Sequence, residues 1–370
     1  MRPLDLLVRL LAVCSVLVLA RPILAGQGLL VGAQLRLTQD DYRTEATFTA
    51  ALERALAPLD REPRALPKVV VLPECVGLPL VVTDAAPALF ACASMDLASA
   101  ALAAGLAVQD GGFRATAAQW LVRTGGNLDR ATGNALLTHE GRRALELYLR
   151  VFAGLARRHG ITLCAGSLLC PGFTLVDGRP RFDDGLDIYN TCVTFGPDGR
   201  VVNVTRKVFP TADESGVVTP AKVEQVRAFD TPLGRAGVLV CADGWFPECY
   251  RQLRAERVEI VLQPSMMFER SKWERPWGGY SGWPLAADVD RSDVGKLTEA
   301  QAWDRYALVG RIASCGARAG VNPFQVGRLW EHVTGGRTRA VVLGPHGYEA
   351  RYARGDRDAE LVVVRVPGTR

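Results

Sequence analysis

The stretch GVLVCADGWFPECYRQL, residues 237–253, contains the signal that decides the fold. It begins as an apolar, β-branched strand, and the pattern from about 246 to 257 is that of a helix. Cys241 falls between the two elements, at a tight bend near the N-terminus of the helix, and both features favour an exposed thiolate. A buried cysteine that ends a core strand is the commoner alternative. The small Ala242 leaves room for a ligand, and Asp243 is interpreted mainly as a helix cap.

The composition around this stretch is that of an ordinary folded protein. Of the 370 residues, 48% are apolar and 22% are charged, which allows a substantial core. The net charge of +5 falls to +3 without the first 26 residues, which carry three arginines and one aspartate, and this is too little to indicate nucleic-acid binding. The nine cysteines have no metal-like spacing, so we expect neither a metal nor a cofactor. Three of them are expected to pack in the core as small apolar side chains: Cys164, Cys170 and Cys192.

Residues 1–26 predict a signal peptide or a single membrane anchor. Arg2 and Arg9 precede an uninterrupted apolar stretch at 10–20, and small residues follow at 25 and 26. The apolar stretch is short for a span of roughly 20 residues, so cleavage is preferred to anchoring. We therefore expect an exported or membrane-anchored protein, or a cytoplasmic one if this segment is only a hydrophobic first helix.

Strands and helices alternate along the rest of the chain, which predicts a layered α/β protein. Two irregular stretches interrupt the alternation, at about 84–140 and 266–298, and we interpret the first as an inserted lid or cover. The predicted strands are 29–37, 68–74, 161–169, two that flank the turn Pro197-Asp198-Gly199, 237–241, 258–265, 339–344 and 359–366. The predicted helices are 42–59, 141–158, about 246–257 and about 299–315.

Three reactive side chains each stand at the end of an apolar strand. Glu74 ends KVVVLPE, Lys207 follows VVNVTR, and Cys241 ends GVLVC. Ligands of open α/β sheets bind at the edge where the carboxyl ends of strands meet. We therefore expect the three side chains to converge in one pocket, although 167 residues separate Glu74 from Cys241. Taken singly, each is more often a structural or a surface residue.

The three residue types together suit nucleophilic chemistry at a carbonyl. Desolvation would raise the pKa of the Glu74 carboxyl toward the range that is useful for proton transfer. Lys207 would neutralise a thiolate and the oxyanion of a tetrahedral intermediate. A hydrolase with a Cys-His pair is the less favoured alternative. The four histidines are interpreted as surface or structural residues: His139, His159, His332 and His346.

The segments that carry these residues resemble the three catalytic segments of the nitrilase, or carbon–nitrogen hydrolase, superfamily. They are LPE at 72–74, RKVFP at 206–210 and CADGWFPE at 241–248, in the order of the family and each after a strand. The third segment is the most specific, and ARAGVNP at 317–323 is a weaker match. The resemblance covers about residues 28–367, and the two irregular stretches are its least typical part.

The resemblance implies a four-layer α-β-β-α sandwich of the nitrilase type in a carbon–nitrogen hydrolase domain over 27–370. It implies Glu74 as general base, Lys207 as the cation that stabilises the oxyanion and Cys241 as nucleophile. Glu214 would position the substrate or the lysine. A homodimer or higher homo-oligomer is also implied. The histidine that is common after the lysine in this family is absent, because Val208 and Phe209 follow instead, so no role for it is carried over.

Ala242 and Asp243 resemble the amidase and carbamoylase branches rather than true nitrilases. The resemblance therefore implies hydrolysis of a small-molecule amide or carbamoyl substrate through a cysteine thioester. Candidate substrate-binding residues are Ala242, Asp243, Trp273 and Trp277. With Trp283, the two tryptophans would line an aromatic acyl pocket or, equally, form an interface or the core of the second insert. An acyltransferase of the same superfamily and a catalytically silent binding protein are the alternatives.

Overall fold

The computed structural model describes residues 27–367 of the chain. The signal peptide or anchor predicted at 1–26 lies outside the described residues, so export or anchoring stays a prediction. Within the described part, no helix combines the length and the apolar character that a membrane span requires.

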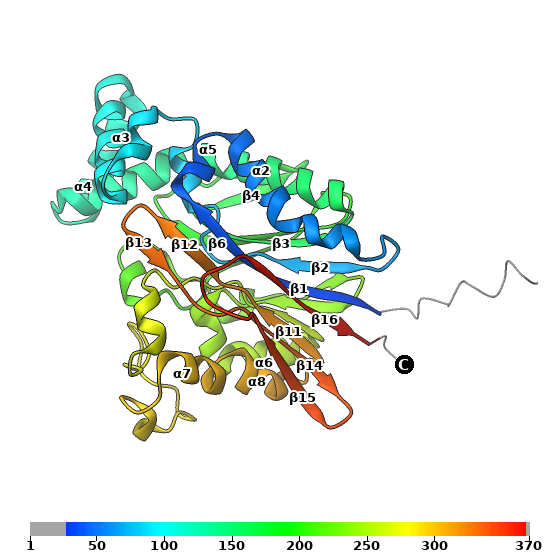
Figure 1. Ribbon diagram of the computed structural model, residues 1–370. Helices are drawn as coiled ribbons and strands as arrows, with labels where there is room; N and C mark the ends of the chain where they lie inside the picture. The colour runs from blue at the N-terminus through cyan, green and yellow to red at the C-terminus, as the bar shows by residue number, and fades with distance from the viewer. Residues whose placement is uncertain (1–26, 368–370) are drawn as a thin grey trace, which may run out of the picture.

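Two β-sheets pack face to face, and helices cover the outer face of each sheet (Figure 1). The first sheet has the order β13-β12-β1-β2-β3-β6-β7, with β16 also paired to β1, and the second has the order β15-β14-β11-β10-β9-β8. Helices α2 and α5 lie on the first sheet, and α6 and α8 lie on the second. The predicted α-β-β-α sandwich is therefore confirmed.

The elements have the following bounds. The first sheet consists of β1 (Gly28–Thr38), β2 (Lys68–Val71), β3 (Thr162–Pro171), β6 (Ile188–Phe195), β7 (Val201–Arg206), β12 (Gln325–Leu329), β13 (His332–Thr334) and β16 (Glu360–Val366). The second consists of β8 (Phe229–Thr231), β9 (Gly234–Val238), β10 (Ile260–Leu262), β11 (Ala319–Asn322), β14 (Arg339–Gly344) and β15 (Gly347–Tyr352). A separate hairpin joins β4 (Phe173–Val176) to β5 (Arg179–Phe182). The helices are α2 (Glu45–Leu56), α3 (Met95–Gln109), α4 (Gly111–Arg123), α5 (Leu128–His159), α6 (Pro247–Ala255), α7 (Glu299–Tyr306) and α8 (Leu308–Cys315).

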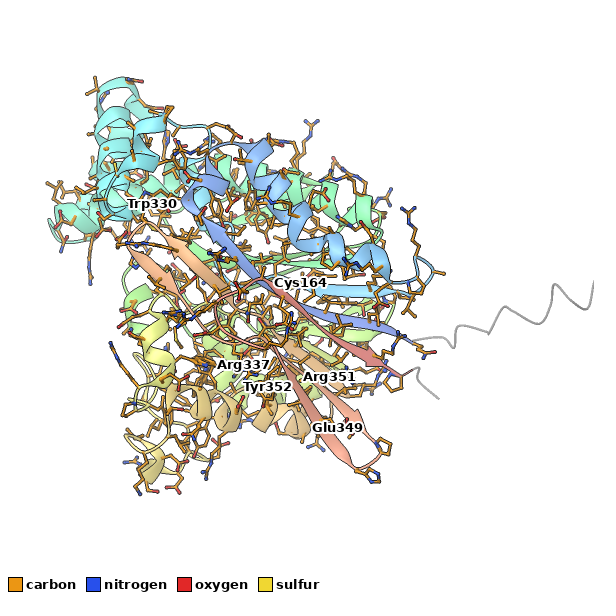
Figure 2. All side chains as sticks on the ribbon, viewed as in Figure 1. Cys164, Trp330, Arg337, Glu349, Arg351 and Tyr352 are labelled. Carbon is orange, nitrogen blue, oxygen red and sulfur yellow. The ribbon has the colours of Figure 1, made fainter. Side chains whose placement is uncertain are left out.

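The central strands are apolar on both faces because each face has a partner layer. Along β1, Leu30 packs in the core between the sheets, whereas Leu29 and Val31 pack in the core under α2 and α5. Cys164 of β3 lies between the two sheets, with its Sγ 3.4 Å from that of Cys192 (Figure 2). These continuous apolar runs are typical of strands that are covered on both sides.

Strand direction brings the ends of β2 and β7 to one edge of the first sheet. β1, β2 and β3 are parallel, and the two antiparallel pairings β3–β6 and β6–β7 give β7 the same direction as β2. In the second sheet, β9, β10 and β11 are also parallel. The segments that follow β2, β7 and β9 can therefore meet at one place.

Several predicted boundaries were wrong. The helix predicted from 141 begins at Leu128, because Gly141 packs closely against β3 and Gly133 is tolerated at an exposed position of α5. Much of the stretch 84–140 is therefore helical. The helix predicted over 299–315 is divided at Ala307, whose backbone is extended between α7 and α8. The strand predicted at 237–241 is β9, which spans Gly234–Val238. The strands β4, β5, β8, β11, β12, β13 and β15 were not predicted.

Candidate active site

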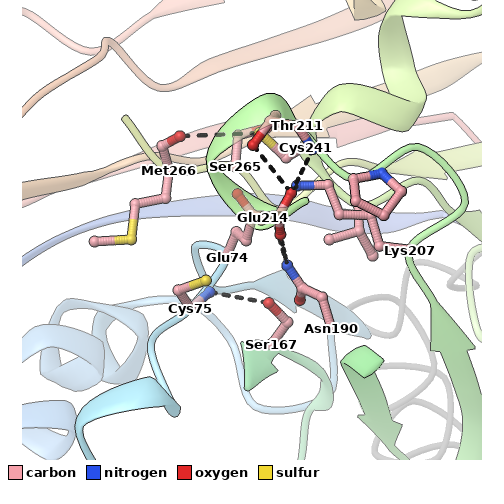
Figure 3. A network of polar contacts seen from close by, with 12 residues as sticks. Glu74, Cys75, Ser167, Asn190, Lys207, Thr211, Glu214, Cys241, Ser265 and Met266 are labelled. Atoms are coloured by element: carbon pink, nitrogen blue, oxygen red, sulfur yellow. Dashed lines mark hydrogen bonds and ion pairs between the residues drawn. The ribbon is translucent and has the colours of Figure 1, made fainter. Parts of the chain in front are cut away.

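The three strand-end residues line one cavity with a volume of about 590 Å³. Glu74 follows β2, Lys207 follows β7, and Cys241 follows β9 after a short extension of the strand (Figure 3). Glu214, seven residues after Lys207, lines the same cavity. The chain thus brings together four side chains from three strand ends of two sheets.

The loop after β2 fixes the position of Glu74. The next residue, Cys75, has a left-handed backbone with φ of +57°, and its N–H donates to the hydroxyl of Ser167 at 2.9 Å. Gly166, at an irregularity in β3, has φ of +68°, and a Cβ there would overlap the carbonyl oxygen of Pro73. A strained turn and a close backbone contact therefore hold the carboxyl group.

Lys207 lies between two carboxylates. Its Nζ is 2.8 Å from Oε1 of Glu74 and 2.6 Å from Oε2 of Glu214. The side chain of Lys207 is 2% exposed, that of Glu74 is 5% exposed and that of Glu214 is 16% exposed. Thr211 contributes a further backbone N–H to Glu214, at 2.8 Å. The result is a buried cluster in which one cation forms ion pairs with two anions (Figure 3).

Asn190 completes this cluster and was not predicted from the sequence. Its Nδ2 donates to Oε1 of Glu74 at 2.9 Å and to Oε1 of Glu214 at 2.8 Å. It is fully buried in β6, and its Oδ1 has no hydrogen-bond partner among the described residues. The only sequence signal is a polar residue inside the apolar strand IYNTCVTF.

The pKa values of the three charged groups move in different directions. Burial disfavours the ammonium of Lys207, but the charges of Glu74, Cys241 and Glu214 outweigh it and raise the pKa of Lys207 well above its ordinary value. Burial raises the pKa of Glu74 despite the opposing charge of Lys207. Burial acts in the same direction on Glu214, but Lys207 and the hydrogen bonds lower its pKa overall. Two neighbouring carboxyls are thereby separated into one that is easier to protonate and one that stays ionised.

Cys241 lies at the start of a 3-10 turn, Cys241–Trp245, with φ of +51°. Its N–H donates to the carbonyl of Pro264 at 2.8 Å, and its own carbonyl accepts from the side chain of Gln263 at 3.0 Å. Burial, and then the charge of Glu74, raise the pKa of the Cys241 thiol well above its ordinary value. The expectation that the bend and the helix N-terminus favour an exposed thiolate was therefore wrong: the thiol is buried beside a carboxylate, and α6 begins only at Pro247.

Asp243 joins two of the strand ends and does not cap the following helix. It is fully buried, and its carboxylate accepts the backbone N–H groups of Val208 at 3.0 Å, Phe209 at 2.8 Å and Val240 at 3.1 Å. Helix α6 begins without a side-chain cap. The prediction of a cap was thus wrong. The carboxylate instead ties the segment after Lys207 to the segment that carries Cys241.

The predicted tryptophans occupy different places. Trp277 and Trp283 line the cavity with Trp245, and Ala242 lines it next to the thiol. Trp273 does not line the cavity and packs in the large core around the second sheet, where its ring lies 5.4 Å from that of Phe324 and beneath the guanidinium of Arg339. The first insert contributes a further wall of the cavity, which includes Met95, Ala98, Leu136 and Leu137.

None of the four histidines, all of which lie in the described part of the chain, lines this cavity. His139 contacts Asp110 and Glu140, and His159 contacts Glu53 at 2.7 Å. Among residues 27–367 there is also no group of three His, Cys, Asp or Glu side chains with the arrangement of a metal site. The base nearest to Cys241 is therefore the carboxylate of Glu74.

Comparison with known proteins agrees with this geometry. Residues 129–279 match the family model of carbon-nitrogen hydrolases. Nitrilase 3 of Arabidopsis thaliana is 30% identical over 82 residues, which are 22% of this chain and 24% of that protein. The omega-amidase NIT2 of Homo sapiens is 34% identical over 100 residues, which are 24% of this chain and 35% of that protein. The chain thus aligns with well under half of the length of these relatives.

The folds agree over almost the whole chain. Nit3 of Saccharomyces cerevisiae, described as a member of branch 10 of the nitrilase superfamily, superimposes with a TM-score of 0.51 at 17% identity, covering 94% of this chain and 92% of that one. The carbon-nitrogen hydrolase of Helicobacter pylori G27 gives the same TM-score and identity, with 92% and 89% covered. The matched segment, the two-sheet fold and the three strand-end segments are thus all similar to those of the nitrilase, or carbon–nitrogen hydrolase, superfamily.

Proposed function

We propose that the protein hydrolyses an amide or carbamoyl carbon–nitrogen bond, with Cys241 as nucleophile, Glu74 as general base and acid, and Lys207 as the cation. The observation that carries this proposal is the contact of one buried lysine with both Glu74 and Glu214, in the cavity that also holds the thiol of Cys241. The pKa of Glu74 is raised and that of Glu214 is lowered, which suits different roles for the two carboxyls. A base with a raised pKa can take a proton and return it near neutral pH. A partner that stays ionised keeps Lys207 charged throughout the cycle.

The first step forms the thioester. Glu74 takes the thiol proton as Sγ of Cys241 attacks the carbonyl carbon, and the carbonyl oxygen becomes an oxyanion. Lys207 and the backbone N–H of Ala242, in the first turn after the nucleophile, stabilise this charge. When the intermediate collapses, the carbon–nitrogen bond breaks, and the proton on Glu74 passes to the departing nitrogen.

The second step releases the acid. Water attacks the thioester carbon while Glu74 takes one of its protons, so that a new carbon–oxygen bond forms. The carbon–sulfur bond then breaks, and the proton returns to the sulfur of Cys241. Splitting the reaction at the thioester replaces one difficult step with two easier ones. The net reaction consumes one water and yields an acid and an amine or ammonia.

The walls of the cavity support a substrate of moderate size with an apolar part. A volume of about 590 Å³ lies in the range of sites for drug-sized ligands, and both inserts contribute apolar side chains to its lining. The residues after the nucleophile, Ala242 and Asp243, favour the amidase or carbamoylase branch over true nitrilases. We therefore propose amides or N-carbamoyl compounds as the substrate class.

The experiment that tests this proposal measures ammonia or amine release by the purified protein from a panel of amides, N-carbamoyl compounds and nitriles. Turnover is expected for amides or N-carbamoyl compounds, and the variant Cys241→Ala should lose it while it melts at the same temperature as the wild type. The matched control is Cys92→Ala, which removes a partly exposed thiol of the first insert. Turnover that persists in the folded Cys241→Ala protein contradicts the proposal.

The same assay separates the alternatives. An acyltransferase would form a new amide when a second amine is added, at the expense of the free acid. A silent binding protein would release nothing from any member of the panel, even though amides protect Cys241 from a thiol-alkylating reagent. Either result would exclude hydrolysis as the main activity.

A further inference from the structure

One part of the cavity is built from aromatic rings that the catalytic steps do not use. Trp245 is the centre of this aromatic wall, with ring centroids 5.7 Å from Trp277, 5.7 Å from Tyr280 and 4.9 Å from Trp303. All four rings line the same cavity as Cys241. Because Trp245 belongs to the 3-10 turn that starts at Cys241, the wall runs outward from the nucleophile.

A carboxyl group lies at the far part of this wall. Glu299 is the first residue of α7 and lines the cavity, and it lies one helical turn before Trp303, on the same face of the helix. Burial raises the pKa of Glu299 to about 7. Lys272 lines the same cavity and lowers the pKa of this carboxyl through its charge, but it is half-exposed and forms its ion pair with Glu269, at 3.8 Å, and not with Glu299. Glu299 is therefore an acid in the wall without a close cation to neutralise it.

The indole N–H of Trp303 is a buried donor beside this carboxyl. Its interaction with the carboxylate lowers the pKa of Glu299 against the effect of burial, but the N–H has no hydrogen bond of normal geometry among the described residues. The residue itself is 4% exposed. Buried donors in folded proteins nearly always have a partner, so this N–H indicates that a ligand or a rearranged carboxylate completes the site.

We propose that this part of the cavity is a subsite for a protonated amine carried by the substrate, held by the carboxylate of Glu299 against the faces of the aromatic wall. The inference rests on the proposed function and narrows its substrate class to amides or N-carbamoyl compounds with a second, cationic nitrogen. Aromatic faces attract cations, and a partly buried carboxylate gains most from a cation that replaces its lost water. A purely apolar substrate would leave the Glu299 carboxyl desolvated and unpaired, which is unfavourable.

The test uses the probes butylammonium and 1-butanol, which are similar in size and differ in charge. Isothermal titration calorimetry at about pH 8.5, where Glu299 is ionised, should give butylammonium an affinity for the wild type at least about tenfold higher than that of 1-butanol. In Glu299→Gln this ratio should fall to about two or less. The matched control Glu274→Gln, which changes an exposed carboxylate of the second insert, should keep the wild-type ratio.

A second variant keeps the test informative if Glu299→Gln does not fold. Lys272→Gln removes the competing positive charge from the half-exposed side chain, and it should tighten butylammonium binding by about two- to fivefold without tightening that of 1-butanol. Equal binding of the two probes to the wild type overturns the subsite. A preference for butylammonium over 1-butanol that persists in a folded Glu299→Gln protein also overturns the subsite.

Because these measurements need no turnover, they separate this inference from the hydrolase proposal. A matching kinetic comparison uses N-carbamoyl derivatives of 1,4-diaminobutane and of butylamine, and it should show a preference for the first that Glu299→Gln removes. If neither compound is hydrolysed while butylammonium still binds in a Glu299-dependent manner, the subsite stands and the proposed activity fails. If both are hydrolysed equally well, the subsite fails and the activity stands.

Discussion

Lys207 is in contact with two carboxylates that differ in burial and in hydrogen bonding. Glu74 is nearly fully buried, whereas Glu214 is slightly exposed and accepts additional hydrogen bonds from Thr211. Those extra donors favour the ionised form of Glu214, and the desolvation of Glu74 favours its neutral form. The difference depends on which backbone and side-chain donors reach each carboxyl, and Asn190 reaches both.

Replacing Asn190 with alanine should impair catalysis without unfolding the protein. The variant loses two hydrogen bonds to charged groups, each worth about 1.5–3 kcal/mol, so kcat/KM should fall by roughly 10- to 100-fold. Because the lost donors stabilise ionised carboxylates, the pKa of the catalytic base should rise. The acidic limb of the pH profile of kcat/KM, where activity is lost as the base becomes protonated, should therefore move to higher pH.

The control for this prediction is Asn203→Ala on the neighbouring strand β7, whose amide donates only to Thr205 among the described residues. This variant should leave the acidic limb of the pH profile of kcat/KM unchanged. A fall in kcat/KM of Asn190→Ala with an unmoved acidic limb would show that Asn190 is only structural.

At the residue scale, the sequence singled out Glu74, Lys207 and Cys241 because each ends an apolar strand, a position that can be recognised without any knowledge of pairing. Asn190 has no such mark, since its contact with both carboxylates depends on the register in which β6 pairs with β3 and β7. The thiolate expected at Cys241 was wrong because burial beside Glu74 is a property of the assembled site.

At the scale of elements, the position of Glu74 depends on the irregularity in β3. Gly166 allows the chain to turn there and allows the carbonyl of Pro73 to approach the backbone of β3 closely. The same irregularity presents the hydroxyl of Ser167 to the N–H of Cys75. The position of Glu74 is thus set by a neighbouring strand as well as by its own.

The variant Gly166→Ala should lose activity and stability together. The new Cβ would overlap the carbonyl oxygen of Pro73 and would also occupy a left-handed conformation, which costs on the order of 3 kcal/mol in total. Gly160→Ala is the matched control, because Gly160 has φ of +59° but open space around it, so only the conformational cost of about 1 kcal/mol applies. Urea denaturation of both variants and their kcat values check this, and equal losses of stability would contradict the steric account.

Elements with a strong periodic pattern were predicted from the sequence. Elements whose structure depends on pairing or packing with other elements were not. The turn at Pro197-Asp198-Gly199 joins β6 and β7 as expected, because its residues specify the turn. The strands β12 and β13 were missed because they are short and depend on their partners: β12 pairs with the end of β1, and β13 pairs with β12. The start of α5 was missed because glycine is tolerated in a helix whose other side chains pack well.

At the scale of the whole molecule, the first insert packs on the edge of the first sheet through a small core. Phe113, Trp120 and Ala131 belong, with Ile188 of β6, to an apolar cluster separate from the two large cores around the sheets. Met95 and Ala98 of α3 and Leu136 of α5 also line the cavity, so this insert forms part of its wall. The predicted homo-oligomer stays a prediction, which light scattering of the purified protein would test.

Replacing Trp120 with alanine should loosen this insert and leave the sandwich intact. Trp120 is buried, and its indole N–H donates to the hydroxyl of Thr138 at 2.9 Å, so truncation costs about 3–5 kcal/mol within a small core. Hydrogen exchange should accelerate in α3 and α4, while amides of β1, β2 and β3 keep their protection. Uniform acceleration across the sheets would show that the insert is part of the main cooperative unit.

The most direct test of the account is the site of the covalent intermediate. The wild-type protein, quenched with acid during turnover of an amide and digested, should carry the acyl group on the peptide that contains Cys241, as observed by mass spectrometry. The variant Cys241→Ala should carry none. Cys75 lines the same cavity and provides an internal comparison. An acyl group on Cys75, or turnover by Cys241→Ala, would contradict the assignment of Cys241 as the nucleophile.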